Sequence, residues 1–192
     1  MSFFDRLTAA TAALIVIDVQ EKLVTRIDQR DRVIANALLL ARGANLLGIP
    51  VWATEQYPKG LGPTIAPLVE LIPRRPDKTM FHCASIPSIL EDLYYHKIRH
   101  VTLAGIEAHV CVAQSALELL KLGFKVQISA DAVGSRHAID REFALRRLER
   151  VGAVVSTTEA ILFEWMESAD HPRFKEFSAM IKEADLSKSS AP

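Results

Sequence analysis

The chain has 192 residues, enough for one domain with a complete hydrophobic core. Hydrophobic residues make up 49% and charged residues 24%, which is an ordinary balance for a globular protein of enzyme size. The 23 basic residues equal the 23 acidic residues, and the short basic clusters are interrupted by acids, so the composition argues against a nucleic-acid partner.

Cysteine use and the first apolar run bear on the cellular compartment. Cys83 and Cys111 are the two cysteines, and they show no paired spacing, so they make neither a disulfide framework nor a four-ligand zinc site. The apolar run at 12–17 ends at Asp18 and is far too short to cross a bilayer. We therefore expect a cytoplasmic protein with reduced thiols and no membrane partner.

Strands and helices are predicted to alternate along the chain. Apolar runs predict strands at 12–20, 49–56, 99–106, 124–132 and 153–159, with a short extended piece that ends at Lys78. Helical spacing of apolar residues predicts helices at 30–48, 87–97, from the Cys111 turn to about 122, and at 138–152, 157–168 and 171–185. Segment 57–78 is rich in proline and glycine and is predicted to be mostly loop.

This alternation is typical of a parallel sheet with helices on both faces. The sequence shows no internal repeat, so we expect a single domain at 1–184 and a disordered tail at 185–192. In open sheets of this kind, ligands bind beyond the carboxyl ends of the strands. Polar residues that follow predicted strands should therefore meet at one edge: Asp18, segment 55–57, Lys78 and the turn at 105–111.

Asp18, Lys78 and Cys111 together indicate a nucleophilic site. Each alone has an ordinary explanation, as a structural aspartate, a solvated lysine or a small buried thiol. In combination, the carboxylate can accept the thiol proton, and the lysine and the helix N-terminus should favour the thiolate and lower the thiol pKa. The turn before Cys111 can also present backbone N–H groups to the oxyanion of an acyl transfer.

Five segments carry a resemblance to a known family: LIVIDVQ at 14–20, PDKTMFHCAS at 76–85, AGIEAHVCVAQSALEL at 104–119, SADAVGSR at 129–136 and GAVVSTTEAILFEW at 152–165. In these segments, which span nearly the whole chain, the sequence resembles the isochorismatase-like cysteine hydrolase superfamily. The stretch TEQYPKGLGPT at 54–64 is similar to the isochorismatase-domain-containing branch, whose physiological substrates are generally unassigned.

The resemblance implies a three-layer α/β/α fold, doubly wound around a central six-stranded parallel sheet. It implies a catalytic triad of Asp18, Lys78 and Cys111, and a cis peptide bond between Ile106 and Glu107. That bond would direct the amides of Glu107 and Cys111 toward one point as an oxyanion hole. The family commonly forms closed oligomers, and the segment AILFEWMES is apolar on more than one face, so we expect a homo-oligomer, a dimer or larger.

The chain departs from two kinds of relative. Nicotinamidases hold a metal through an Asp-x-His pair after the second strand, whereas the matching segment at 53–63 contains no histidine and offers at best Glu55. We therefore expect no metal and no other cofactor, and nicotinamide is not the expected substrate. Isochorismatases proper lack the cysteine at the nucleophile position, so Cys111 favours covalent chemistry on an amide-like carbon over cleavage of isochorismate.

Four further residues are candidates for substrate contacts: Gln20, which the strand period places on the same side as Asp18, and Gln56, Tyr57 and Phe81. His109, two residues before Cys111, either contacts the site or has a structural role, and the structural role is favoured; Cys83 is expected to be an inert core thiol.

The leading hypothesis is a cysteine hydrolase that acts on a small amide or other C–N substrate through a thioester acyl-enzyme. Two alternatives stay open: a non-catalytic interaction protein on a hydrolase scaffold, and a redox-sensing thiol at Cys111.

Overall fold

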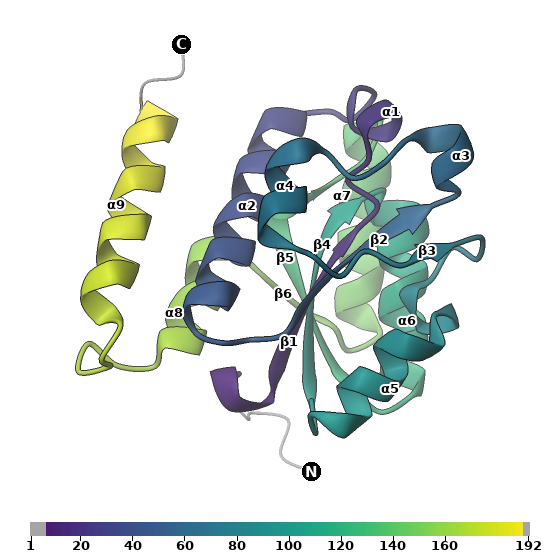
Figure 1. Ribbon diagram of the computed structural model, residues 1–192. Coiled ribbons are helices and arrows are strands. Elements are labelled where there is room, and N and C mark those ends of the chain that lie inside the picture. Colours follow the sequence, from purple (N-terminus) through teal and green to yellow (C-terminus); the bar gives the residue numbers. More distant parts are fainter. Residues whose placement is uncertain (1–6, 190–192) are drawn as a thin grey trace.

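A parallel sheet forms the centre of the computed structural model, which describes residues 7–189. Its six strands lie in the order β3-β2-β1-β4-β5-β6, and each neighbouring pair is parallel (Figure 1). Their bounds are β1 Ala12–Ile17, β2 Val51–Gln56, β3 Asp77–Lys78, β4 His100–Ile106, β5 Lys125–Gly134 and β6 Val154–Ser156. Every residue of β1 and β4 is buried, which explains why these strands are unbroken apolar runs.

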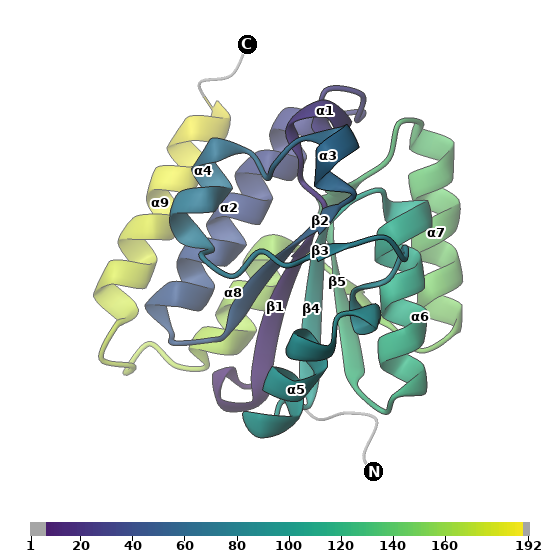
Figure 2. The ribbon, with the colours of Figure 1, turned by 45° about the vertical axis from the view of Figure 1, so that its right-hand side comes forward.

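Helices cover both faces of the sheet, as Figure 2 shows from a second direction. One layer holds α2 Arg30–Leu46, α4 Ala66–Leu71, α8 Thr158–Met166 and α9 Phe174–Ser189. The other layer holds α5 Pro87–Tyr95, α6 Ala113–Lys121 and α7 Ala138–Arg150. Two separate apolar clusters fill the spaces between the sheet and these layers, so the expected three-layer α/β/α fold is confirmed.

Short helical segments lie in the connections. They are α1 Glu21–Val24, α3 Pro58–Leu61, the 3-10 turns η1 Ala9–Thr11 and η2 Cys83–Ser85, and the π-helical segment η3 Ala108–Val112. Segment 57–78 is therefore less irregular than the sequence predicts, because α3 and α4 both fall within it. Each of these two helices has a proline in its first turn, where the missing N–H has no helical partner to lose.

The C-terminal helix differs from its prediction in length and in position. Helix α9 continues to Ser189, so residues 185–189 are helical although the sequence assigns them to a tail; residues 190–192 lie outside the described residues. Helix α9 packs on the outer side of α8, where the rings of Phe163 and Phe177 meet edge to face with centroids 5.0 Å apart. This contact covers only part of the second apolar face of α8, because Phe163 remains 46% exposed.

Position 105 has room only for glycine. Gly105 has φ 109, and a Cβ placed there would lie 2.1 Å from the carbonyl oxygen of Ile17 on the neighbouring strand. A side chain at this position would therefore separate β4 from β1 at the end where both strands lead into the candidate site.

Within residues 7–189, no helix has the length and apolar composition needed to cross a bilayer.

Candidate active site

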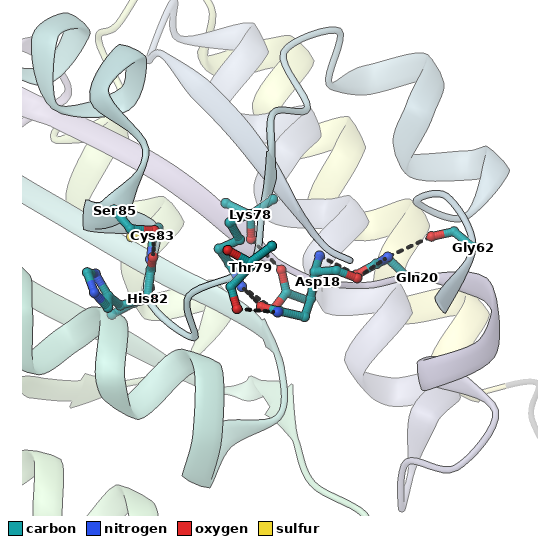
Figure 3. Close-up of polar contacts among 11 residues, drawn as sticks. Asp18, Gln20, Gly62, Lys78, Thr79, His82, Cys83 and Ser85 are labelled. Atoms are coloured by element: carbon teal, nitrogen blue, oxygen red, sulfur yellow. Dashed lines mark hydrogen bonds and ion pairs between the residues drawn. The ribbon is translucent and has the colours of Figure 1, made fainter. Parts of the chain in front are cut away.

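Asp18 and Lys78 form a buried ion pair at the carboxyl edge of the sheet (Figure 3). Lys78 Nζ lies 2.7 Å from Asp18 Oδ2, and the two side chains are 1% and 0% exposed. The remaining polar atoms are also bonded: Thr54 Oγ1 donates to Asp18 Oδ1 at 2.6 Å, and Lys78 Nζ donates to Gln56 Oε1 at 2.7 Å. These hydrogen bonds replace the water that the carboxylate and the ammonium lose on burial.

The backbone at Asp18 is unusual in a way that aims its side chain. Asp18 has φ 51, in the left-handed region that residues other than glycine seldom adopt. Its N–H donates to the carbonyl of Thr54 at 3.1 Å, which extends the pairing of β1 with β2 by one residue. Such a conformation persists only where its surroundings impose it, and it recurs at functional sites.

Gln20 and Gln56 connect the ion pair to the loop after β2. The side-chain oxygen of Gln20 accepts a hydrogen bond from the backbone N–H of Gln56 at 2.7 Å. Its side-chain nitrogen donates to the backbone carbonyls of Gln56 and Gly62 at 3.1 and 2.6 Å. Gln56 in turn donates to the carbonyl of Thr79 at 2.8 Å. Both side chains are buried, and their N–H groups donate to backbone carbonyls. This bonding positions Lys78 and the loop and is not directed at a substrate.

Cys111 lies in η3, which leads directly into α6, on the side of the sheet that α5, α6 and α7 cover. The peptide bond between Ile106 and Glu107 is cis, at the place that the family resemblance implies. The carbonyl of Glu107 accepts hydrogen bonds from the amides of Val110 at 3.0 Å and Val112 at 3.2 Å. The strand end, the turn and the first helical residues therefore form one continuous structure around the thiol.

The thiol of Cys111 is protonated at neutral pH in this structure. Burial, the negative charge of Asp18 and a hydrogen bond to that carboxylate raise the pKa of Cys111 to about 12, and the opposing charge of Lys78 does not offset them. Lys78 lowers the thiol pKa as expected, but the expected net decrease is wrong, because burial and Asp18 raise the pKa by more.

Cys83 belongs to the same neighbourhood but not to the accessible site. It is 0% exposed, and its backbone N–H donates to Ser115 Oγ at 2.9 Å, one helical turn beyond Cys111. Burial raises the pKa of its thiol to about 11. The hydrogen bond with Ser115 and the charge of Lys78 lower it by less, and the charge of Asp18 raises it slightly. Figure 3 shows Cys83 beside His82 and Ser85, apart from the contact between Asp18 and Lys78.

Tyr57 precedes α3 and Phe81 lies in the segment after β3, and both are largely exposed, at 56% and 49%. Tyr57 donates its backbone N–H to the carbonyl of Lys78 at 3.0 Å. Its ring covers Gly60, where an added Cβ would lie 2.6 Å from the ring. Of the four residues predicted to contact substrate, these two have surface available for that role.

Carboxylates near the loop after β2 already have protein partners. Glu55 Oε1 accepts hydrogen bonds from the backbone N–H and the hydroxyl of Thr64, both at 2.8 Å. Among the residues that the structure describes, no group of three or more His, Cys, Asp or Glu side chains is arranged to hold a metal ion.

Three residues that bond to the site are absent from the sequence-based prediction. Thr54 and Ser115 hold Asp18 and Cys83 from β2 and α6, and Arg136 bonds to Glu107. A serine or threonine inside a strand or a helix shows no sequence pattern that indicates which residue its hydroxyl will contact. Arg136, however, lies in SADAVGSR, one of the segments that carry the family resemblance, and this segment could have drawn attention to it.

We expect iodoacetamide to label Cys111 in the folded protein faster than Cys83, because their exposures are 6% and 0%. Since the pKa of Cys111 is about 12, its rate should rise about tenfold per pH unit between roughly pH 7 and pH 9. Timed labelling followed by peptide mass mapping measures both rates, and unfolded protein, in which the two thiols should react alike, is the control. A Cys111 rate that levels off below about pH 8, or equal rates in the folded protein, would contradict this account.

Comparison with known proteins agrees with the fold. The isochorismatase domain family model matches residues 12–160. The chain is 40% identical to isochorismatase domain-containing protein 2 from Danio rerio, over 94% of this chain and 92% of that protein. It is 38% identical to isochorismatase domain-containing protein 1 of the same species, of which it spans 62% of the length.

Among solved structures, the MAR1 ribonuclease from Caenorhabditis elegans matches with a TM-score of 0.88 and 40% identity, over 93% of each chain. The family model covers most of this chain, and the Danio rerio protein 2 aligns over 94% of it. The chain therefore belongs to the isochorismatase domain family.

Proposed function

We propose that the protein is a cysteine hydrolase that cleaves a small amide or related C–N substrate through a thioester at Cys111. Membership of the isochorismatase family supports a hydrolase in general. The observation that carries the finer proposal is the position of Asp18, whose carboxylate lies 2.7 Å from Lys78 Nζ and raises the pKa of the Cys111 thiol. A base, a fixed cation and a nucleophile thus meet at the strand ends.

Formation of the thioester begins with a neutral thiol. As the sulfur of Cys111 attacks the substrate carbonyl carbon, its proton passes to Asp18, and the carbonyl electron pair moves onto oxygen. The high thiol pKa requires this transfer to accompany the attack, because a preformed thiolate is scarce. Lys78 remains positively charged beside the neutral Asp18 and offsets the negative charge that forms on the substrate.

The tetrahedral oxyanion needs N–H donors, and we assign this role to the amides of Glu107 and Cys111. Asp18 then returns its proton to the leaving nitrogen as the C–N bond breaks, which releases an amine or ammonia. Water attacks the thioester with Asp18 again as the base, and the sulfur of Cys111 regains a proton. Exposed faces of Tyr57 and Phe81 are the proposed contacts for the rest of the substrate.

The name of the C. elegans relative raises RNA cleavage as a second activity. Binding of single-stranded RNA relies on basic grooves that follow the phosphates, and this chain has equal numbers of basic and acidic residues. The central groups of the site are also deeply buried, with Asp18 at 0% and Cys111 at 6% exposure. A small molecule fits such a site better than a polynucleotide, so we propose amide hydrolysis and include RNA among the compounds tested.

A redox-sensing thiol and a non-catalytic scaffold are the other two candidates. Thiols that sense oxidants have a low pKa and are accessible, whereas the pKa of Cys111 is raised to about 12. A scaffold protein has no need for a buried, fully hydrogen-bonded ion pair next to a thiol. Both observations favour hydrolysis.

The decisive experiment screens small amides, carbamoyl compounds, thioesters and RNA, followed by acid quench and intact mass. For an accepted substrate we expect a mass increase equal to its acyl group, mapped to the peptide that contains Cys111. Cys111→Ala should lower turnover by about 10⁴-fold or more and abolish the adduct.

Cys83→Ala is the matched control, because it removes the neighbouring thiol while leaving Asp18, Lys78 and Cys111 in place. It should retain both the adduct and turnover within about threefold. Turnover that survives Cys111→Ala, or cleavage of RNA alone, contradicts the proposed function.

We expect activity to survive exhaustive chelation. Asp18 is paired with Lys78 and Thr54, and Glu55 with Thr64, so the carboxylates near the site are already used. The test is to purify the protein without a histidine tag, dialyse it against a strong chelator and assay it beside an elemental analysis. Stoichiometric metal whose removal abolishes turnover would overturn the mechanism.

We also propose a homo-oligomer, with a dimer as the minimum, although the reason differs from the one that the sequence offers. Helix α9 covers part of α8 and leaves Phe163 46% exposed, and a larger group of exposed apolar side chains lies elsewhere. Four exposed apolar side chains lie along α7 and at β6, each more than 45% exposed: Ile139, Phe143, Val151 and Val154. Light scattering at working concentration should report at least twice the 21.3 kDa chain mass, and a monomeric mass would refute this.

A further inference from the structure

Glu107 is the residue on which the turn before Cys111 depends. It follows β4 across the cis bond, and its carbonyl accepts the amides of Val110 and Val112 at 3.0 and 3.2 Å. Because these bonds begin the helical structure that contains Cys111, a shift of Glu107 would move both proposed oxyanion donors together. The orientation of Glu107 is therefore a requirement of the proposed chemistry.

The side chain of Glu107 works against that chemistry unless it is neutralised. Its carboxylate is 11% exposed, so water screens its charge only weakly. Its negative charge is one of the causes that raise the pKa of the Cys111 thiol. The same charge would oppose negative charge on the sulfur of Cys111 and on the tetrahedral oxygen.

Arg136 is placed to remove this conflict. Glu107 Oε2 accepts hydrogen bonds from the backbone N–H of Arg136 at 2.9 Å and from its Nε at 3.1 Å. Strand pairing delivers the two residues to each other, because β4 and β5 remain paired up to Ile106 and Gly134. The backbone hydrogen bond and the charge-assisted one on the same oxygen hold the carboxylate in place and set a positive charge beside it.

A second contact holds the same two segments together. His109 Nδ1 lies 3.0 Å from Ser135 Oγ, so η3 is tied to residues 135 and 136 at two places. Ser135 is 1% exposed, and its carbonyl also accepts the amide of Asp28 at 3.0 Å. The segment after β5 is thus anchored independently of Arg136, and a variant of Arg136 should keep the local fold.

We infer that Arg136 is a positioning residue for the Cys111 site: it clamps the Glu107 carboxylate and cancels its charge next to the nucleophile and the oxyanion. This inference rests on the proposed function and identifies how the turn is held ready for it. Two consequences separate it from a purely structural role. Loss of Arg136 should make Cys111 less reactive, and removal of the Glu107 charge should reverse that loss.

The experiment compares Arg136→Ala, Glu107→Gln and the double variant with the wild-type protein. Glutamine keeps an oxygen that can accept both bonds but carries no charge. Arg146→Ala is the matched control, because it removes another arginine–glutamate pair, to Glu142 in α7, whose side chains are 61% and 49% exposed. Melting temperatures check that each variant is folded, and iodoacetamide rates at Cys111 report thiol reactivity without any substrate.

Arg136→Ala should slow alkylation of Cys111 about threefold or more, and Glu107→Gln should accelerate it by a similar factor. The double variant should return to within about twofold of the wild type, as should Arg146→Ala. With a substrate in hand, Arg136→Ala should lower kcat about tenfold with little change in KM, and Glu107→Gln should restore part of that loss.

Rate changes of the same sign in both single variants would overturn the inference, as would a double variant that is no faster than Arg136→Ala. Failure of the proposed function has a different signature. In that case Cys111→Ala would retain turnover, while the opposite effects of the two single variants on alkylation would still be measurable.

Discussion

Burial of the ion pair between Asp18 and Lys78 is the constraint on which the rest of the site depends. Two opposite charges at 2.7 Å and no more than 1% exposure cost several kcal/mol of desolvation per ion unless other groups replace the lost water. Thr54 and Gln56 supply those groups, and both lie on β2, between the strands that lead to Asp18 and Lys78. The strand order thus determines which residues solvate the pair.

The same pair explains how a thiol of high pKa could act as the nucleophile of the proposed reaction. A carboxylate beside Cys111 raises the thiol pKa, and in the proposed mechanism it also receives the proton. When the proton moves from sulfur to Asp18, the sum of the three charges does not change, because Lys78 keeps its positive charge. A buried site tolerates a shift of charge between neighbours better than the creation of net charge. The sulfur therefore stays neutral until an electrophile is present.

Local patterns reveal some of these residues and conceal others. Asp18, Lys78 and Cys111 stand out because each follows a strand and carries a reactive group. Gln20 and Gln56 also stand out, but the structure bonds them to backbone and to Lys78, and that bonding depends on a loop whose helices α3 and α4 the sequence does not predict. The pKa of Cys111 is raised, against the sequence-based prediction, because burial and the charge of Asp18 outweigh the charge of Lys78. Only packing sets how far each charged group lies from the thiol.

Apolar periodicity and strand-end positions are local properties of the chain, so the parallel α/β fold could be predicted from them, together with the edge of the sheet where Asp18 and Lys78 lie. The contact of α9 with α8, the hydrogen bonds of Thr54 and Gln56 to the ion pair, and the contact of Arg136 with Glu107 emerge only in the folded chain. Those contacts join residues from different elements, brought together by strand order and side-chain packing. No short-range pattern records which of many possible partners a polar side chain will meet.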